Sequence, residues 1–415
     1  MPTSPSPSPI TPSREARARN ASPLRGSLAW FVAPHTIDSF LDAHFEREPL
    51  HVPGDARRFR ALPTLDAIDR FVTQHELRAP AARMAREGSS LDASAFTRAD
   101  GVVDPVLLAA RLGEGATLIL DRVQTWNAAA ARLCAGLGRD VQGHAWANLY
   151  LSPPRSHGFA PHTDDADVFV LQLSGEKRWA LYAAPEEFPP LTPVGRGHVD
   201  VGDARATLTL RAGDVLYVPR GHPHAAATLD QASLHLTVAF TPTTWAAALH
   251  AAVDAFAARD ARARHAVPFG AFRDPGSVRA TFDALLSSLA EGTDADATLR
   301  KVHGDLALDR APRARGMIAA AVAGESLTYD SVVVRRSALD VAVVREGAHL
   351  LLRVAGRTVT LPEHAASGVR RLLSGRPVRV SDLPDDLDDE GKQVLAKWLM
   401  REGVVRVVTA ERGAR

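Results

Sequence analysis

Residues 158–179 read GFAPHTDDADVFVLQLSGEKRW, and this stretch decides the class of fold. An apolar run at 168–173 is followed by the turn residues Ser-Gly-Glu and by a second run at 178–182. Short apolar runs divided by Gly and Pro are typical of β-strands. The same pattern predicts further strands at 206–210, 215–218 and 233–240. Several short strands at this spacing predict a sandwich or a barrel.

A metal-ligand pattern lies within this strand-rich region. His162 and Asp164 are two residues apart, so on an extended chain their side chains share one face. Two imidazoles and one carboxylate form the ligand set of non-haem Fe(II) sites. A second histidine would come from the segment 219–224, PRGHPH, where His222 and His224 have the same strand parity. Spacing does not show which of these two histidines would bind the metal. The simpler alternative is that His162 caps a turn and that His222 and His224 are exposed loop residues.

Three further polar residues fall in predicted strands. Lys177 lies at the head of the strand expected at 177–182, and a cation among apolar strand residues is costly unless it meets an anion. A dicarboxylate co-substrate bound to the metal would supply that anion, whereas a surface lysine is the alternative. Asn148 and His235 could line the same pocket, or each could satisfy a buried polar group of the core. Cys134 has no neighbours that suggest a lowered pKa, so we expect a packing residue.

Composition excludes several classes of protein. The chain has 415 residues, a formal net charge of +1 and 46% hydrophobic residues, which permit a sizeable core and argue against a strongly basic nucleic-acid coat. A single cysteine excludes an internal disulfide and a cysteine-based zinc or iron–sulfur site. No apolar run approaches the length of a membrane span, and the first residues lack the apolar core of a secretory signal. We therefore expect a cytoplasmic protein.

The segments outside the strand-rich region predict an α+β chain with four parts. Residues 1–26 are rich in Pro, Ser and Arg, so we expect a disordered tail there. Helix-period apolar residues flank the strands, with a short capped helix expected at 37–45. The region 246–322 predicts two amphipathic helices that suit a dimer interface. Helices followed by a β-ribbon at 323–412 are the outline of a winged helix.

Five sequence motifs, in their order along the chain, resemble those of the JmjC-type ribosomal oxygenases. The segments that carry the resemblance are NLYLSPP (148–154), GFAPHTDD (158–165), FVLQLSGEKRW (169–179), GDVLYVPRG (213–221) and SLHLT (233–237). Members of that family are cupin-fold hydroxylases of ribosomal proteins that use Fe(II), 2-oxoglutarate and O₂. The resemblance is strong over about residues 27–245, and it continues more weakly through a helical dimerisation region and a C-terminal winged helix.

The resemblance implies a role for each candidate residue. It implies a double-stranded β-helix, or jelly-roll, catalytic core at 27–245, with iron on His162, Asp164 and His224. It places the far carboxylate of 2-oxoglutarate on Lys177, with Asn148 and His235 lining the pocket. It also implies a homodimer and a ribosomal protein as the hydroxylated partner.

Two other functions remain open at the level of sequence. The same oxygenase chemistry could act on a small molecule or a biosynthetic peptide. Alternatively, the barrel could only sense a ligand for a DNA-binding winged helix. The acidic stretch at 382–390 would repel phosphate, so we expect no specific DNA binding and no membrane partner.

Overall fold

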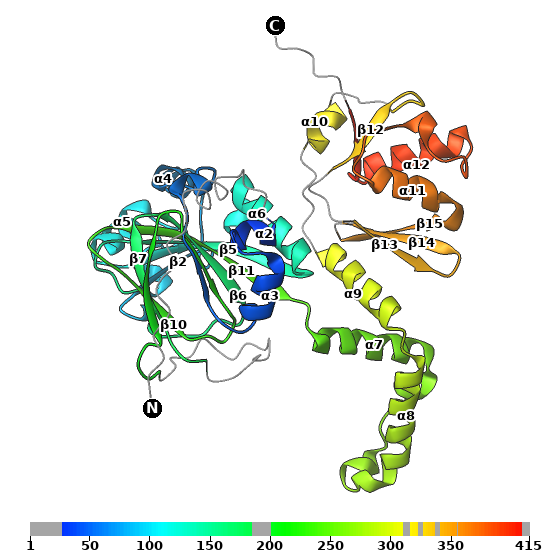
Figure 1. The fold of residues 1–415 in the computed structure, drawn as a ribbon, viewed down its shortest axis with the longest axis horizontal. Coiled ribbons are helices and arrows are strands. Elements are labelled where there is room, and N and C mark those ends of the chain that lie inside the picture. The colour runs from blue at the N-terminus through cyan, green and yellow to red at the C-terminus, as the bar shows by residue number, and fades with distance from the viewer. Residues whose placement is uncertain are drawn as a thin grey trace. The chain divides into compact units, whose positions relative to one another are not determined.

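The computed structural model divides the chain into two compact units, Met1–Pro242 and Thr243–Arg415. The residues that the structure describes are 27–184, 201–309, 316–322, 327–336, 341–354 and 356–408. The predicted disordered tail at 1–26 therefore lies outside the described residues. The two units are taken separately below (Figure 1).

Unit 1 contains two antiparallel β-sheets. The larger has eight strands in the order β1-β9-β6-β11-β5-β4-β2-β3, and the smaller has three in the order β10-β7-β8. Their bounds are β1 Leu50–Val52, β2 Ala82–Arg86, β3 Ser89–Ser90, β4 Thr117–Leu120, β5 Gly143–Ser152, β6 Asp167–Ser174, β7 Glu176–Leu181, β8 Ala206–Arg211, β9 Val215–Val218, β10 His224–Thr228 and β11 Ser233–Pro242. The strands predicted around 168–240 are confirmed within two residues at each end.

The two sheets pack face to face. Successive side chains along a strand point to opposite faces, so each strand of the pair turns every second side chain toward the other sheet. Val168 and Val170 of β6 join a buried cluster with Trp179 of the smaller sheet. Their neighbours Phe169 and Leu171 point to the opposite face of the larger sheet and enter the main core cluster. Strand β6 is therefore buried on both faces, which explains why its sequence is continuously apolar.

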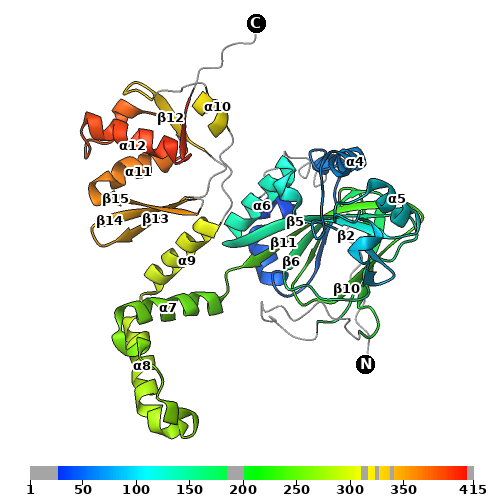
Figure 2. The same ribbon diagram turned by 180° about the vertical axis from the view of Figure 1, so that it is seen from behind.

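Helices cover the face of the larger sheet that is turned away from the smaller one. In both views α2, α3 and α6 lie together against this sheet (Figures 1 and 2). The helices of unit 1 are α2 Leu28–Val32, α3 Ile37–Ala43, α4 Leu65–Gln74, α5 Pro105–Gly113 and α6 Ala128–Asp140. Stacked aromatic rings join the two layers, as for Phe31 and Phe169 with centroids 4.7 Å apart. The helix expected at 37–45 is confirmed, and the Thr36 side chain accepts a hydrogen bond from the Ser39 amide.

One tight turn carries the chain from the larger sheet to the smaller one. Gly175 joins β6 to β7 with a φ of 65°, a conformation that side chains rarely adopt. A Cβ atom there would lie 1.9 Å from the Ala232 carbonyl oxygen, so only glycine fits. The turn places Lys177 at the head of β7, with its side chain between the sheets.

Unit 2 contains helices followed by two three-stranded antiparallel sheets, in the orders β16-β12-β17 and β13-β14-β15. The bounds are α7 Trp245–Arg259, α8 Arg279–Gly292, α9 Ala295–Asp309, α10 Met317–Val322, β12 Val332–Arg335, β13 Val341–Glu346, β14 His349–Val354, β15 Arg357–Pro362, α11 Ala366–Leu373, β16 Val378–Arg379, α12 Asp389–Arg401 and β17 Val405–Val407. A buried cluster joins Val369 of α11 and Leu395 of α12 to Val333 of β12. None of the helices in the described part of the chain combines the length and apolar character needed to span a bilayer.

Candidate metal centre

Backbone pairing between two segments brings the predicted ligands together. His162 lies before β6 and His224 is the first residue of β10, yet the two form an antiparallel bridge. The His162 amide donates to the His224 carbonyl at 3.1 Å, and the His224 amide donates to the His162 carbonyl at 2.9 Å. The Gly221 amide also donates to the Asp164 carbonyl at 2.8 Å. Because the main chain makes these bonds, the ligand geometry does not depend on side-chain packing alone.

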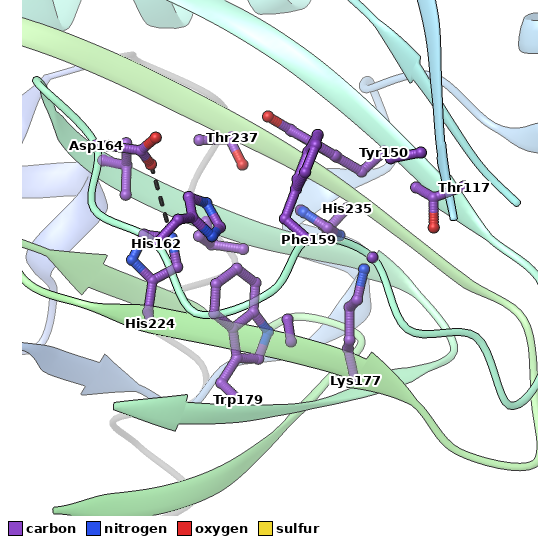
Figure 3. Close-up of a pocket in the computed structure, with 15 residues that line it drawn as sticks. Thr117, Tyr150, Phe159, His162, Asp164, Lys177, Trp179, His224, His235 and Thr237 are labelled. Carbon is purple, nitrogen blue, oxygen red and sulfur yellow. Dashed lines mark ion pairs between the residues drawn. The ribbon is translucent and has the colours of Figure 1, made fainter. Parts of the chain in front are cut away.

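The side chains of these residues converge on one point. His162, Asp164 and His224 each offer one ligand atom, and these atoms all lie within 4.8 Å of one another. Nε2 of His224 is 3.6 Å from Oδ2 of Asp164, and the two imidazole centroids are 4.5 Å apart (Figure 3). The Asp164 side chain remains 27% exposed, so one side of the centre is open to solvent. An open side is what a metal that binds substrate requires.

Both imidazoles are held in the tautomer that a metal ligand needs. Nδ1 of His162 lies 2.9 Å from the Ala160 carbonyl oxygen, and Nδ1 of His224 lies 3.0 Å from the His222 carbonyl oxygen. A carbonyl oxygen only accepts, so each Nδ1 carries the proton and each Nε2 keeps its lone pair. Burial also lowers the pKa of His224, which favours the neutral ring.

The structure separates the two histidines that spacing left equivalent. His224 belongs to the three-residue cluster, whereas His222 is not a member of any such cluster in the residues described. The His222 side chain is buried, and burial lowers its pKa. Its main-chain carbonyl, not its ring, serves the centre by orienting His224.

The three ligands lie at one end of a cavity between the sheets. Figure 3 shows Lys177 and His235 at the other end, with Trp179 and Phe159 between them. The lining residues are Ala85, Thr117, Tyr150, Gly158, Phe159, His162, Asp164, Val168, Val170, Lys177, Trp179, His224, Ala226, His235 and Thr237. Apolar walls with polar groups at both ends are typical of small-molecule sites.

Lys177 is a buried cation without a countercharge. Its side chain is 3% exposed, and Nζ donates to the Ser152 hydroxyl at 2.9 Å. No carboxylate among the described residues pairs with it, and burial lowers the pKa of Lys177 to about 7. Such an ammonium gains most from an anion delivered by a ligand, because the described part of its own chain offers none.

The structure places the other two predicted pocket residues differently. His235 lines the cavity, stacks on Tyr150 with centroids 4.7 Å apart, and has no hydrogen-bond partner for Nδ1 within the described residues. Burial and the Lys177 charge hold its pKa well below its usual range. Asn148 is not among the lining residues; its side-chain oxygen accepts the Arg122 amide at 3.0 Å. The structure thus shows Asn148 bonded to a backbone group while its strand partner Thr237 lines the cavity, so a pocket role for Asn148 stays a prediction.

Sequence reasoning missed several residues that shape the cavity. Trp179 lies between the two ends, with its ring centroid 5.8 Å from that of His224 and 5.7 Å from that of His235. Strand parity could have found it, because Trp179 lies two residues after Lys177 and so shares its face. Thr117 could not have been found in this way, since it comes from β4 and its hydroxyl meets the Ser152 hydroxyl at 2.9 Å.

A buried polar network behind the centre was also missed. The Tyr217 hydroxyl donates to Asp167 at 2.5 Å and accepts the Glu46 amide at 2.9 Å. Arg220 forms an ion pair of 2.8 Å with the Glu46 side chain. Burial raises the pKa of Asp167 to about 6. The network ties the N-terminal helical layer to the two segments that carry the ligands, and nothing in the sequence spacing signals it.

The residues fit a divalent metal of the non-haem iron type. Two imidazoles with free Nε2 atoms and one carboxylate are the ligand types, and the number of ligands, that metals of this class use in proteins. The fold and site together define a double-stranded β-helix protein with a two-histidine, one-carboxylate centre. Sequence comparison carries this further, because residues 123–248 match the family model described as the JmjC domain.

Named relatives point in the same direction. The chain is 34% identical to the bifunctional lysine-specific demethylase and histidyl-hydroxylase NO66 of Dictyostelium discoideum, over 53% of this chain and 44% of that protein. It is 32% identical to ribosomal oxygenase 1 of Gallus gallus, over 54% of this chain and 37% of that protein. The chain thus spans less than half the length of these relatives. Residues 123–248 thus match the JmjC domain, and the chain is similar in sequence to proteins named as ribosomal oxygenases.

Solved structures share the fold. The Escherichia coli ribosomal oxygenase YcfD matches 90% of this chain and 98% of its own, with a TM-score of 0.53 and 18% identity. A structure of the same protein in complex with cobalt and 2-oxoglutarate matches with a TM-score of 0.52, also at 18% identity, over 90% of this chain and 99% of that one. At this identity the likeness concerns the fold.

Proposed function

We propose that this protein is an Fe(II)- and 2-oxoglutarate-dependent dioxygenase that hydroxylates a C–H bond on a side chain of a ribosomal protein. One observation carries the proposal: a single cavity holds an oriented two-histidine, one-carboxylate cluster at one end and a buried, unpaired lysine at the other. A metal alone would need only the first end. A metal with a dicarboxylate co-substrate would use both.

The chain's residues divide the work between binding and exclusion of water. His162, Asp164 and His224 would hold the iron, and the carbonyls of Ala160 and His222 keep the two rings in place. When bound, iron with 2-oxoglutarate and O₂ supplies the oxidising power that no amino-acid side chain has. The protein contributes position and a dry, shaped cavity.

The far end of the cavity would select the co-substrate. Lys177 is placed to pair with a carboxylate by a charge-assisted bond, which is stronger in a water-poor site. Neutral His235 and the Thr117 hydroxyl lie beside it and offer hydrogen bonds without adding charge. The apolar Val168, Val170 and Trp179 would then cover the chain of the ligand between its two ends.

The proposed substrate rests on the relatives. Their names describe a histidyl-hydroxylase and a ribosomal oxygenase, so a ribosomal protein is the partner class that we propose for this chain. A ribosomal substrate would place the protein in the cytoplasm. The names of the relatives give no support to the alternatives of a small-molecule substrate or a DNA-sensing role.

Succinate release tests the proposal. Purified protein with Fe(II), 2-oxoglutarate and O₂ should form succinate slowly even without a protein substrate, and no succinate should form when Fe(II) is left out. Mass spectrometry of ribosomal proteins from cells with and without the gene should then show one protein that gains a single oxygen. Succinate formation that proceeds without iron would contradict the metal chemistry. A complete lack of added oxygen on ribosomal proteins would contradict the substrate.

We also propose that unit 2 serves assembly, with a homodimerisation region at 246–322 and a winged helix at 323–412. Positions 310–315, 323–326, 337–340, 355 and 409–412 lie outside the described residues. Exposed apolar side chains support the first part, since Leu249 of α7 and Phe282 and Leu286 of α8 are 64%, 58% and 49% exposed. The packing of α11 and α12 on the β16-β12-β17 sheet supports the second. Light scattering of the full chain should give the mass of a dimer.

A further inference from the structure

A groove adjoins the metal centre on the side away from Lys177. Its walls are the tip of the β2–β3 hairpin, residues 87–90, and the segment 159–161 that leads to His162. It shares Tyr150, Phe159, His162 and Asp164 with the inner cavity. The groove has about 520 Å³ of free space, against about 60 Å³ in the inner cavity by the same measure. The room for a large substrate is therefore in the groove.

The hairpin presents an open β-strand edge to this groove. Strand β3 is the last strand of the larger sheet; Gly88 before it forms an isolated bridge with Phe159, and beyond that bridge no described strand pairs with the outer edge. The Leu91 amide donates inward to Met84 at 2.8 Å, whereas the Gly88 amide donates outward to Gly158 at 2.8 Å. Because amides alternate in direction along a strand, the Ser90 amide points outward like that of Gly88. An extended peptide can pair with such an edge.

Glu87 gives the groove an unbalanced negative charge. Its side chain is exposed, and it forms no ion pair or hydrogen bond with any residue that the structure describes. The neighbouring Arg86 forms no ion pair with Glu87; its side chain reaches Glu114 at 3.0 Å, which Arg111 also contacts at 2.8 Å. The groove lining contains no Lys or Arg, and its other carboxylate, Asp164, belongs to the metal centre. An unpaired carboxylate at the rim favours a cationic partner.

The backbone conformation at Glu87 is a second reason to expect a function for this side chain. Its φ is 51°, and Gly88 follows with a φ of 87°. Two successive positive φ values suit Asn or Gly in a two-residue hairpin, not a long side chain such as Glu. The turn would form more easily with another residue. A strained residue beside a reaction centre is a reason to look for a function there.

We propose that the groove binds an extended, cationic segment of the protein substrate, with a basic side chain on the Glu87 carboxylate and main-chain bonds to the β3 edge at Ser90. This inference deepens the proposed function and rests on it. The register would leave a side chain of the bound segment free to enter between Phe159 and His162 toward the centre. Glu87 is then a specificity-determining residue for an oxygenase whose substrate is a polypeptide.

A binding assay with charge-matched peptides tests this proposal. The probe is a labelled pool of decapeptides with arginine fixed at two positions and the others varied, beside a pool with neutral citrulline at the same two positions. Binding is measured by fluorescence polarisation to the full chain loaded with Mn(II) and 2-oxoglutarate under nitrogen, so that no turnover occurs. We expect the arginine pool to bind about tenfold more tightly, as one charge-assisted bond predicts.

Variants of one residue isolate the Glu87 carboxylate. Glu87→Asn removes the charge while it suits the turn, and Glu87→Gln keeps the size of the side chain. Both should abolish the preference for arginine over citrulline. Glu76→Gln is the matched control, because Glu76 is an exposed glutamate of the same unit without a partner among the described residues. It should leave the preference unchanged.

The outcomes separate this inference from the proposed function. If the wild-type protein forms no succinate from 2-oxoglutarate with Fe(II), the proposed function fails. If it forms succinate but binds both pools alike, or if Glu76→Gln weakens the arginine preference as much as Glu87→Asn does, the inference about the groove is wrong. Loss of the preference in the Glu87 variants alone supports it.

Discussion

The two ends of the inner cavity differ in how complete they are. At the metal end the chain itself orients both imidazoles, through the reciprocal His162–His224 backbone bonds and the carbonyls that accept from the two rings. At the other end Lys177 is buried with one neutral partner, the Ser152 hydroxyl. The first end is prepared before any ligand arrives. The second end lacks its countercharge until an anionic ligand enters.

The largest effect is expected at the metal end of the cavity. Asp164→Ala removes the one charged ligand, so we expect succinate formation to fall by at least about a thousandfold, as for loss of a catalytic metal. Calorimetric titration with Mn(II) should show that metal binding is lost as well. His222→Asn is the control, because His222 lies on the segment that leads to the ligand His224 but its side chain is not part of the cluster. It should still bind the metal, and equal losses in both variants would contradict the assigned ligand set.

The second-largest effect is expected at the Lys177 end of the cavity, which lacks a countercharge. Lys177→Met should raise the KM for 2-oxoglutarate by about 10- to 100-fold, because a charge-assisted bond in a buried site is lost. Metal affinity should stay unchanged. Without ligand, the variant should melt at a higher temperature than the wild type near pH 6, since the buried unpaired ammonium is gone.

Arg178→Met provides the control for this variant. Arg178 is exposed on the same strand and points to the opposite face, so its removal should change neither the KM nor the melting temperature. A Lys177→Met protein with an unchanged KM would show that the far end does not bind the co-substrate.

The pH dependence of the KM sharpens the comparison. The pKa of Lys177 in the free protein is about 7, so the side chain is largely neutral at pH 8. A bound carboxylate favours the ammonium and raises this pKa, so binding above pH 7 requires uptake of a proton. The KM for 2-oxoglutarate should therefore rise by up to about tenfold from pH 7 to pH 8. A KM that stays constant over this range in the wild type, or that rises equally in Lys177→Met, would exclude this linkage.

The smallest expected effect concerns the buried hydrogen-bond network behind the metal centre. Tyr217→Phe leaves Asp167 buried without its hydroxyl donor, which should lower the free energy of unfolding by about 1–3 kcal/mol. Urea unfolding measures this loss, with Tyr182→Phe as a control at a less buried tyrosine. Metal affinity should weaken only a few-fold, because the main-chain bonds between the ligand segments remain. A large loss of metal affinity at unchanged stability would assign Tyr217 a direct role in the centre.

Sequence patterns predicted the parts of the site that depend on local geometry. The strands around 168–240 follow from alternating or nearly continuous apolar runs. Strand parity predicted that His162 and Asp164 share a face; the two side chains do lie together, but on a loop before β6 that makes a single β-bridge at His162, not on a regular strand. Strand β10 was not predicted, because its residues HAAAT carry no alternating pattern. It forms because β7 offers a partner for each of its residues. The choice between His222 and His224 and the role of Asn148 depend on such long-range contacts, so spacing could not decide them.

The covering layer of helices has a consequence for shorter versions of this protein. The JmjC match begins at residue 123, yet Phe31 and Phe40, which precede it by some eighty residues or more, are fully buried against Phe169 and Tyr217. Strand β1 also pairs with β9 along the edge of the larger sheet. A fragment cut at the start of the match would expose an aromatic surface and a bare sheet edge, and it should aggregate when expressed. Fragments intended for crystallisation should therefore begin before Leu28.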